Sequence, residues 1–317
     1  MKDFKYTEKK DTRSGFGVAL DELGEKNPNV VALCADLTGS LKMNNFAKNY
    51  PERFIQTGIA EANMIGLAAG LATSGKIPFA GTFAVFASGR TYDQIRLTAA
   101  YSNKNVKIAA SHSGISVGED GASHQMIEDL ALMRALPNMV VINTCDFNQT
   151  KAATLAAAEY VGPVYLRFGR PNVPNFTPDN QKFEIGKAVI LNEGSDITII
   201  ATGHPVWQAV EAAQELEKQG IYVDLINIHT IKPIDKEAII NSAKKTGAVI
   251  TVEEHSIYGG LGDAVANVLV HNHPVKMQMI GINDTFGESG TTEELFEKYG
   301  LTKNNIIEKA KNIIKNK

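Results

Sequence analysis

The stretch Gly58-Ile-Ala-Glu-Ala-Asn-Met-Ile-Gly-Leu-Ala-Ala-Gly70 lies between two short apolar runs, Phe54-Ile-Gln-Thr57 and Ile77-Pro-Phe-Ala-Gly81. Runs of this length are typical of buried strands, whereas the stretch between them has the length and the apolar period of a helix. A strand, a helix and a second strand in this order form the unit of a parallel sheet. These three segments therefore predict an α/β fold.

The same alternation continues on both sides and divides into two blocks. The first block predicts further strands near 30–33, 106–110, 139–143 and 163–168, and helices near 40–49, 60–73, 86–101, 124–136 and 147–160. From Gly169 to Glu184 the chain becomes rich in Pro and Asn, which is typical of a linker. The second block predicts strands near 196–201, 221–227, 248–252 and 275–280, and helices near 205–219, 235–246, 261–272, 291–299 and 302–315. The pattern predicts two α/β domains, 1–175 and 190–317, joined by a linker at 176–189, each a mostly parallel sheet with helices on both faces.

Glu61 is the only charged residue between Gly58 and Gly70. On a helix it shares a face with Met64, Ile65 and Ala68, so its carboxylate points into packing rather than into water. An unpaired buried carboxylate costs several kcal/mol. Glu61 is therefore either a core residue that accepts a hydrogen bond from a backbone amide or a functional group.

Composition excludes several classes of function. The chain has 317 residues, 44% of them hydrophobic and 21% charged, with a net charge of -3 and no basic cluster, which argues against nucleic acid or an anionic membrane surface as a partner. The N-terminus lacks the apolar core of a signal peptide, and no apolar run is long enough to span a bilayer. Cys34 and Cys145 lie in strand-like runs and are expected to be buried free thiols. These features predict a cytoplasmic protein.

The most polar loop follows the strand predicted at 106–110 and reads Ser111-His-Ser-Gly-Ile-Ser-Val-Gly-Glu-Asp-Gly-Ala-Ser-His-Gln125. In open parallel sheets, functional loops follow the carboxyl ends of strands. His112 and His124 can bind a phosphate or transfer protons near neutral pH. Alternatively, Gly118-Glu-Asp-Gly121 is a solvated turn and Ser123 caps a helix that begins at residue 124. No metal site is expected in this loop, because its carboxylates and imidazoles lack a recognised ligand spacing.

Three segments in this order resemble the C-terminal half of transketolase: the stretch around Glu61, Thr82-Phe-Ala-Val-Phe86, and the loop from His112 to His124-Gln125. The resemblance covers essentially the whole chain. It implies that residues 1–175 are a transketolase pyrimidine-binding domain and that residues 190–317 are a transketolase C-terminal domain.

The resemblance implies thiamine diphosphate as the cofactor. In enzymes of this type the matching Glu forms a hydrogen bond with a ring nitrogen of the aminopyrimidine, a position that Glu61 matches. Phe83 and Phe86 fall where the family places aromatic residues around that ring, although both are also compatible with ordinary packing at a strand end. Gly89 departs from the family, because many transketolases have a further aromatic residue there. The implied catalytic residues are Glu61, His112 and His124.

The substrate contacts that the resemblance implies are Arg13, Ser40, His112, Asp120, His124 and Arg170. Arg13 and Arg170 would bind the sugar phosphate with Ser40 and His112, because a guanidinium binds phosphate through two parallel hydrogen bonds. Asp120 resembles the acid that binds a substrate hydroxyl, and His124 the histidine near the reacting carbonyl.

One motif of the family is missing. The diphosphate and its divalent metal, Mg²⁺ or Ca²⁺, bind a Gly-Asp-Gly motif followed by Asn on another domain, and no such motif occurs here. The resemblance thus implies the C-terminal subunit of a split transketolase that acts on sugar phosphates in the pentose phosphate pathway. A separate N-terminal subunit would hold diphosphate and metal, and this chain would also pair with itself to give an α2β2 heterotetramer.

Three alternatives to this interpretation are compatible with parts of the sequence. One is the β subunit of a 2-oxoacid dehydrogenase E1, and another is a subunit similar to deoxyxylulose-phosphate synthase, which the segment Val252-Glu-Glu-His-Ser-Ile-Tyr-Gly-Gly-Leu-Gly262 resembles more closely. The third is a non-catalytic interaction subunit. Retention of Glu61, Phe86, Arg13 and Arg170 together argues against the third, since no structural requirement explains all four.

Overall fold

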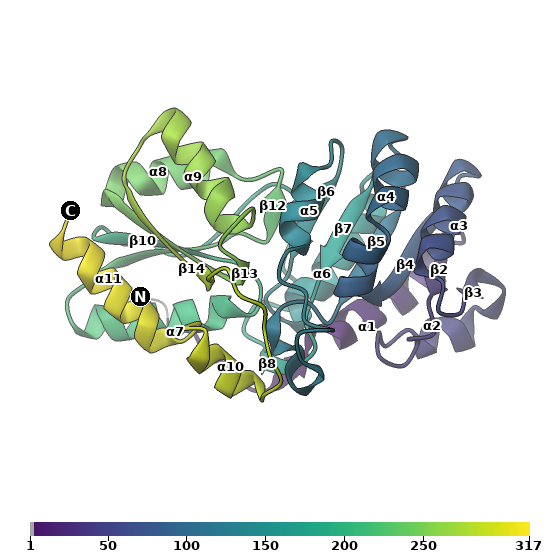
Figure 1. Ribbon diagram of the computed structural model, residues 1–317, viewed down its shortest axis with the longest axis horizontal. Helices are drawn as coiled ribbons and strands as arrows, with labels where there is room; N and C mark the ends of the chain where they lie inside the picture. Colours follow the sequence, from purple (N-terminus) through teal and green to yellow (C-terminus); the bar gives the residue numbers. More distant parts are fainter. Residues whose placement is uncertain (1–2) are drawn as a thin grey trace.

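The computed structural model describes residues 3–317, and its longest axis runs through two α/β units, each with its own sheet (Figure 1). The first sheet has the strand order β12-β6-β7-β5-β4-β2-β3. Its strands are β2 (Val30–Cys34), β3 (Phe54–Gln56), β4 (Ile77–Phe83), β5 (Lys107–Ser111), β6 (Val140–Asn143), β7 (Val164–Arg167) and β12 (Thr230–Lys232). All pairs are parallel except β12 with β6. The β-branched and apolar runs of these strands are buried because helices cover both faces.

Helices cover the first sheet in two layers. On one face lie α1 (Thr12–Lys26), α2 (Asn44–Asn49) and α6 (Phe147–Glu159), and on the other lie α3 (Glu61–Thr73), α4 (Tyr92–Gln94) and α5 (Asp129–Ala135) (Figure 1). Two π-helical segments, Val85–Arg90 and Ile95–Tyr101, flank α4, and 3-10 helices span Pro51–Arg53 and Ile115–Asp120. The helix predicted over 86–101 is therefore wound mainly as a π-helix, a form that often occurs at functional sites.

The second sheet has the order β14-β13-β10-β11-β9, and only β9 runs antiparallel to its neighbour. Its strands are β9 (Val189–Asn192), β10 (Ile197–Ala201), β11 (Val223–Asn227), β13 (Ala248–Ser256) and β14 (Lys276–Ile282). One face is covered by α8 (Lys236–Thr246) and α9 (Leu261–Asn272), and the other by α7 (Pro205–Lys218), α10 (Thr292–Lys298) and α11 (Lys303–Lys315). The prediction of two mostly parallel sheets with helices on both faces is confirmed.

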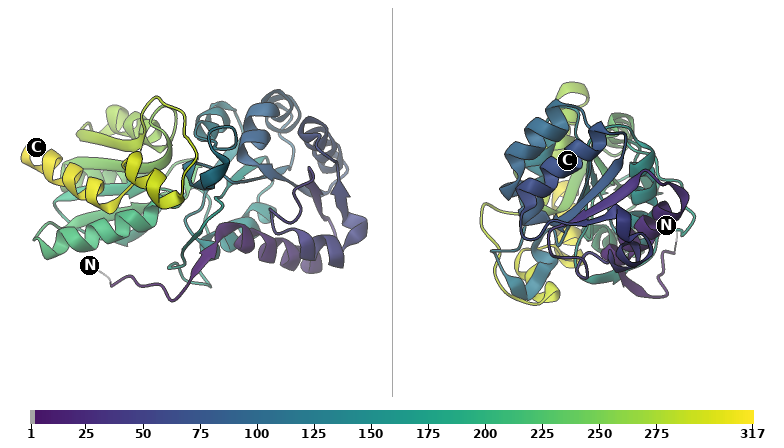
Figure 2. Two further views of the ribbon diagram at one scale, coloured as in Figure 1. Left: turned by 60° about the horizontal axis from the view of Figure 1, so that its bottom comes forward. Right: turned by 90° about the vertical axis from the view of Figure 1, so that its right-hand side faces the viewer.

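Two segments cross between the units. Strand β12 follows β11 in the second unit yet pairs with β6 in the first sheet. At the other end, β1 (Lys9–Asp11) pairs with β8 (Asn172–Pro174), and the chain before β1 runs toward the second unit (Figure 2). There Tyr6 packs edge-on against Trp207 of α7, with ring centroids 5.1 Å apart. The boundaries 1–175, 176–189 and 190–317 stay a prediction.

Other predictions have mixed outcomes. Cys34 and Cys145 are buried free thiols, as predicted. The capping role of Ser123 is wrong, because α5 begins only at Asp129 and the Ser123 hydroxyl lies 3.0 Å from Nδ1 of His124. Within residues 3–317, no helix combines the length and apolarity needed to cross a membrane.

Candidate active site

Glu61 is the first residue of α3, and its side chain is almost fully buried, with 2% of the residue exposed. A carboxylate at this end of a helix is favoured by the helix dipole. Its ion-pair partner is Arg90, whose Nη1 donates to Oε2 at 3.0 Å. The alternative of a core Glu bonded to a backbone amide is thus replaced by a side-chain ion pair that sequence reasoning missed.

Three rings form a stack beside this pair. Phe83 ends β4 and His112 follows β5, and the two meet because Phe83 pairs in register with Ser111 on the adjacent parallel strand. The ring centroids of Phe83 and His112 are 3.7 Å apart with an interplanar angle of 23°. Phe86 lies nearly parallel to Phe83, 6.0 Å away at 11°. The carboxyl edge of the sheet therefore carries a flat aromatic surface next to Glu61.

The two histidines of the loop have different surroundings. His112 is buried in a left-handed backbone conformation, with φ of 56°, and its Nδ1 lies 2.6 Å from Ser111 Oγ. Burial, and then the nearby Arg13 and Arg170, lower the pKa of His112 to about 3. A pKa this low leaves His112 uncharged near neutral pH, where it can form hydrogen bonds, and argues against proton transfer by His112 at that pH. His124 stands edge-on to Phe86, with centroids 5.6 Å apart.

Two arginines lie beyond His112. Arg13 Nη1 donates to the carbonyl oxygen of Ser40 at 3.1 Å, and its Nε lies 3.2 Å from Asp11 Oδ1. Burial lowers the pKa of Arg13, and the charge of Arg170 lowers it further, although Asp11 opposes both. The two guanidinium groups are thus close enough for their charges to interact, and each also has a carboxylate partner, Asp11 for Arg13 and Glu119 for Arg170. Paired guanidinium groups of this kind can bind an anion through their remaining N–H groups.

Arg170 also holds the polar loop. Its Nη1 donates to the carbonyl of Val117 at 2.5 Å and to Glu119 Oε2 at 3.0 Å. Asp120, the next residue, is exposed at the end of the 3-10 helix. The structure thus brings Arg13, Ser40 and Arg170 together near His112, and leaves Asp120 at the rim.

The second unit also holds the loop that follows β5 in place. Glu254 on β13 accepts the backbone N–H of Ser116 at 2.5 Å, and burial raises the pKa of Glu254 to about 7. The approach is so close that a Cβ on Gly114 would lie 2.2 Å from Glu254 Oε1, and Gly114 has φ of 75°. Gln125 adds a further link, because its Nε2 donates to the carbonyl of Glu288 at 2.8 Å. Sequence reasoning missed Glu254, although this residue lies in the segment Val252–Gly262 that resembles deoxyxylulose-phosphate synthase.

Gly89 is exposed and lies in the segment between Phe86 and Arg90. A Cβ built at Gly89 would meet no atom within 4 Å, so no wall stands where the resemblance places a further aromatic residue. The neighbouring Arg90 lies over Phe86 instead, with its guanidinium carbon 4.4 Å from the ring centroid. The missed signal was the spacing of Phe86 and Arg90, four residues apart on a helical segment.

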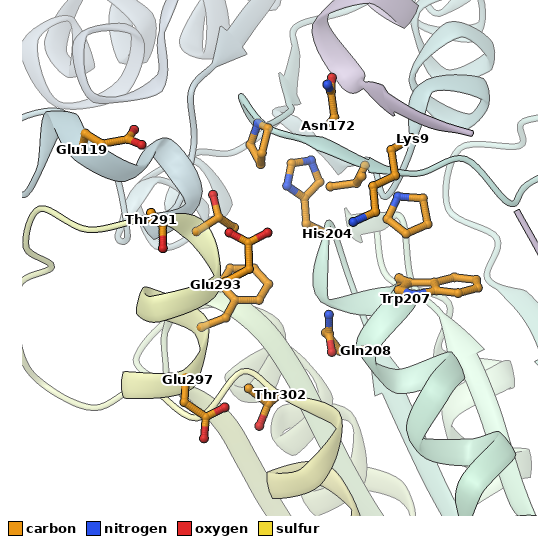
Figure 3. Close-up of a pocket in the computed structure, with 15 residues that line it drawn as sticks. Lys9, Glu119, Asn172, His204, Trp207, Gln208, Thr291, Glu293, Glu297 and Thr302 are labelled. Atoms are coloured by element: carbon orange, nitrogen blue, oxygen red, sulfur yellow. The ribbon is translucent and has the colours of Figure 1, made fainter. Parts of the chain in front are cut away.

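A separate cavity of about 550 Å³ lies at the junction of the two units, next to Glu119. The side chains of Lys9, Gln208 and Glu293 gather around His204 there (Figure 3). Burial lowers the pKa of His204 to about 3, and among residues 3–317 neither ring nitrogen has a hydrogen-bond partner. The cavity shares Glu119 with the loop but none of Glu61, the stacked rings or Arg13.

Comparisons with known proteins agree with this geometry. Residues 8–175 match the family model "Transketolase, pyrimidine binding domain", and residues 186–306 match "Transketolase, C-terminal domain". A Methanocaldococcus jannaschii protein, whose name provisionally describes it as a transketolase C-terminal section, is 52% identical over 95% of each chain. The 6-deoxy-6-sulfo-D-fructose transketolase subunit of Clostridium sp. is 45% identical over 94% of this chain and 92% of that one.

A solved structure gives the same result in three dimensions. A split gene transketolase, described as an inactive beta4 tetramer, superposes with a TM-score of 0.91 at 50% identity, over 96% of this chain and 98% of that one. Rattus norvegicus transketolase is longer: it is 36% identical over 98% of this chain, which spans 50% of it. The transketolase family depends on thiamine diphosphate. The chain belongs to the transketolase family and comprises its pyrimidine-binding and C-terminal domains.

Proposed function

We propose that this chain is the C-terminal subunit of a split transketolase. With a separate N-terminal subunit it transfers a two-carbon ketol unit from a ketose phosphate to an aldose phosphate, using thiamine diphosphate. The observation that carries the proposal is the arrangement of buried Glu61 beside the stacked rings of Phe83 and Phe86, with the arginine pair beyond His112.

The residues of this chain fit one end of the cofactor. Glu61 offers a buried carboxylate to a ring nitrogen, and Phe86 offers a flat face on which an aromatic ring can stack, worth about 0.5–1.5 kcal/mol beyond burial. Across the described part of the chain, no cluster of three or more His, Cys, Asp and Glu side chains is placed to hold a metal ion. We assign the diphosphate and Mg²⁺ or Ca²⁺ to the N-terminal subunit.

When bound, thiamine diphosphate supplies an electron sink for cleavage of the carbon–carbon bond next to the ketose carbonyl. Glu61 would hold a proton at the ring nitrogen of the aminopyrimidine. Neutral His112, together with His124, would form hydrogen bonds with the oxygens of the substrate at the reacting end, since both histidines stand beside the ring stack. Asp120 at the rim would bind a substrate hydroxyl.

The arginine pair favours a substrate with an anionic terminus. Arg13 and Arg170 would bind the phosphate of the sugar together with Ser40, at the end of the site remote from Glu61. The relative from Clostridium sp. is named for a sugar with a terminal sulfonate, another anionic terminus. A small 2-oxoacid, the substrate of a dehydrogenase E1, has no group that would reach these arginines, so the sugar phosphate is the better match.

Exposed apolar side chains support an assembly at this face. Ile59 lies two residues before α3 and is 76% exposed, and Tyr101 ends the π-helical segment that packs against α3 and is 80% exposed. Leu67 and Leu97 on the same elements are also exposed. Exposed apolar side chains spread along neighbouring helices are typical of protein–protein contacts. We place the pairing of this chain with itself, in an α2β2 heterotetramer, at this face.

The test is reconstitution. This chain, its N-terminal partner, and the mixture are each assayed for thiamine diphosphate binding and for ketol transfer between sugar phosphates. Each subunit alone should be inactive, and the mixture should bind cofactor and turn over. Sub-micromolar cofactor binding or turnover by this chain alone would refute the split enzyme.

A further inference from the structure

Arg90 makes two contacts with the residues of the site. Its Nη1 donates to the buried Glu61 carboxylate at 3.0 Å, and its guanidinium carbon lies 4.4 Å from the centroid of the Phe86 ring. The Glu61 side chain is 3% exposed, whereas that of Arg90 is 50% exposed. Arg90 therefore covers the carboxylate from the solvent side and is itself only partly held.

The chemistry of these contacts resembles that of the cofactor ring. A guanidinium is flat, carries nitrogen donors at its edge and stacks on aromatic faces. The aminopyrimidine is also flat and nitrogen-bearing, and the proposed function gives it the same two partners, Glu61 at its edge and Phe86 at its face. Two flat groups cannot occupy one face of Phe86 and the same carboxylate oxygen of Glu61 at once.

We propose that Arg90 is a gate in the cofactor site: its guanidinium occupies the place of the aminopyrimidine ring while the cofactor is absent and leaves when the cofactor binds. The inference rests on the proposed function, since it takes Glu61 and Phe86 as the aminopyrimidine site. Arg90 then sets the affinity for the cofactor without contacting the substrate.

The local structure allows Arg90 to leave. Arg90 ends a π-helical segment, Val85–Arg90, and follows Gly89, around which a Cβ would have no neighbour within 4 Å. Among residues 3–317, Glu61 and Phe86 are the partners of the Arg90 guanidinium. An arginine released to solvent regains full hydration, so the loss is limited to one partly exposed ion pair and one cation–π contact. The cofactor ring takes over both partners that Arg90 gives up.

The affinity of thiamine diphosphate, in the presence of Mg²⁺, tests the gate. It is measured by calorimetry on the chain assembled with its N-terminal partner, for the wild type, Arg90→Ala and Arg90→Gln. Arg90→Ala removes a competitor and should bind about tenfold more tightly, the equivalent of about 1.4 kcal/mol. The affinity of Arg90→Gln should lie between those of the wild type and Arg90→Ala, because the glutamine amide is flat and can donate to Glu61 but has no charge. The difference in cofactor affinity between wild type and Arg90→Ala should become smaller at high salt, because salt screens the ion pair.

Two outcomes overturn the gate. Weaker binding in Arg90→Ala means that Arg90 forms a wall of the pocket, and equal binding means that it is a surface residue. Phe86→Ala serves as the reference and should weaken cofactor binding. If Phe86→Ala binds as tightly as the wild type, the ring does not stack there and the proposed cofactor site fails, which is distinct from failure of the gate alone. Should Arg90→Ala not fold, Arg90→Gln decides by the same criterion.

Discussion

Arg170→Ala should separate phosphorylated from unphosphorylated substrates. The Arg170 side chain is 38% exposed, and both of its hydrogen bonds, to Val117 and to Glu119, use Nη1. Within residues 3–317, Nε and Nη2 have no partner, so one edge of the guanidinium is free for an anion. A charge-assisted contact is worth about 1.5–3 kcal/mol. Its loss corresponds to about 10- to 150-fold in kcat/KM for a phosphorylated acceptor.

The assay needs the reconstituted complex and two acceptors that differ only in the phosphate. Loss of the Val117 contact would loosen the loop and affect both acceptors equally, so the ratio of the two losses isolates the phosphate. Glu119→Gln is the matched control, because it breaks the ion pair and keeps Arg170. An exposed pair is worth about 0.2–1 kcal/mol, so Glu119→Gln should change kcat/KM by at most about fivefold.

Equal losses on both acceptors would refute the phosphate role and make Arg170 a residue that only holds the loop. A different result would redirect the function itself. If the complex decarboxylates pyruvate readily and transfers no ketol unit, the dehydrogenase β subunit becomes the better assignment.

Three further changes test other parts of the structure. Glu61→Gln should fold and assemble but lose about 10²-fold or more in turnover, since an amide cannot transfer the proton of a positioned acid; near-normal turnover would make Glu61 structural. Burial raises the pKa of Glu254 to about 7, above its unfolded value of about 4.3, so this residue should lower the stability of the folded chain as pH rises between those values. Glu254→Gln removes this pH-dependent contribution, so the difference in urea midpoint between wild type and variant should change between pH 5 and pH 8. The same difference at both pH values would contradict the role given to Glu254. Gly169→Ala places a Cβ 2.2 Å from Cε1 of buried His204 and should cost about 1–3 kcal/mol in the free energy of unfolding; no measurable loss would show that the ring can move aside.

The fold was predictable because both sheets are mainly parallel. Buried parallel strands appear as short apolar runs, and the helices between them are long enough to show their period. The short pairings were not predictable: β12 and the pair β1–β8 have three residues in each strand and join distant parts of the chain. Segments this short show no hydrophobic period, so only the three-dimensional structure shows which sheet edge they join.

The candidate site was predicted where its residues lie at strand ends. Phe83 and His112 follow from adjacent strands, so their approach is a consequence of the sheet order. Arg90 and Glu254 were missed for two different reasons. The contact of Arg90 with Phe86 was indicated by their four-residue spacing, but its ion pair with Glu61 joins two helical segments that no local pattern links. Glu254 reaches the loop from the second unit, and no local pattern indicates a contact across 138 residues.

The two ends of the site depend on different parts of the molecule. Glu61, Phe83 and Phe86 lie on α3, on β4 and on the segment after β4, so the first unit alone fixes the cofactor end. The substrate end depends on the loop, and the second unit holds that loop through Glu254 and through the carbonyl of Glu288. A displacement of the second unit would therefore move the loop against the rings while leaving the cofactor end in place. Substitutions at the junction should thus change KM for the sugar more than the affinity for thiamine diphosphate, whereas substitutions around α3 should do the reverse.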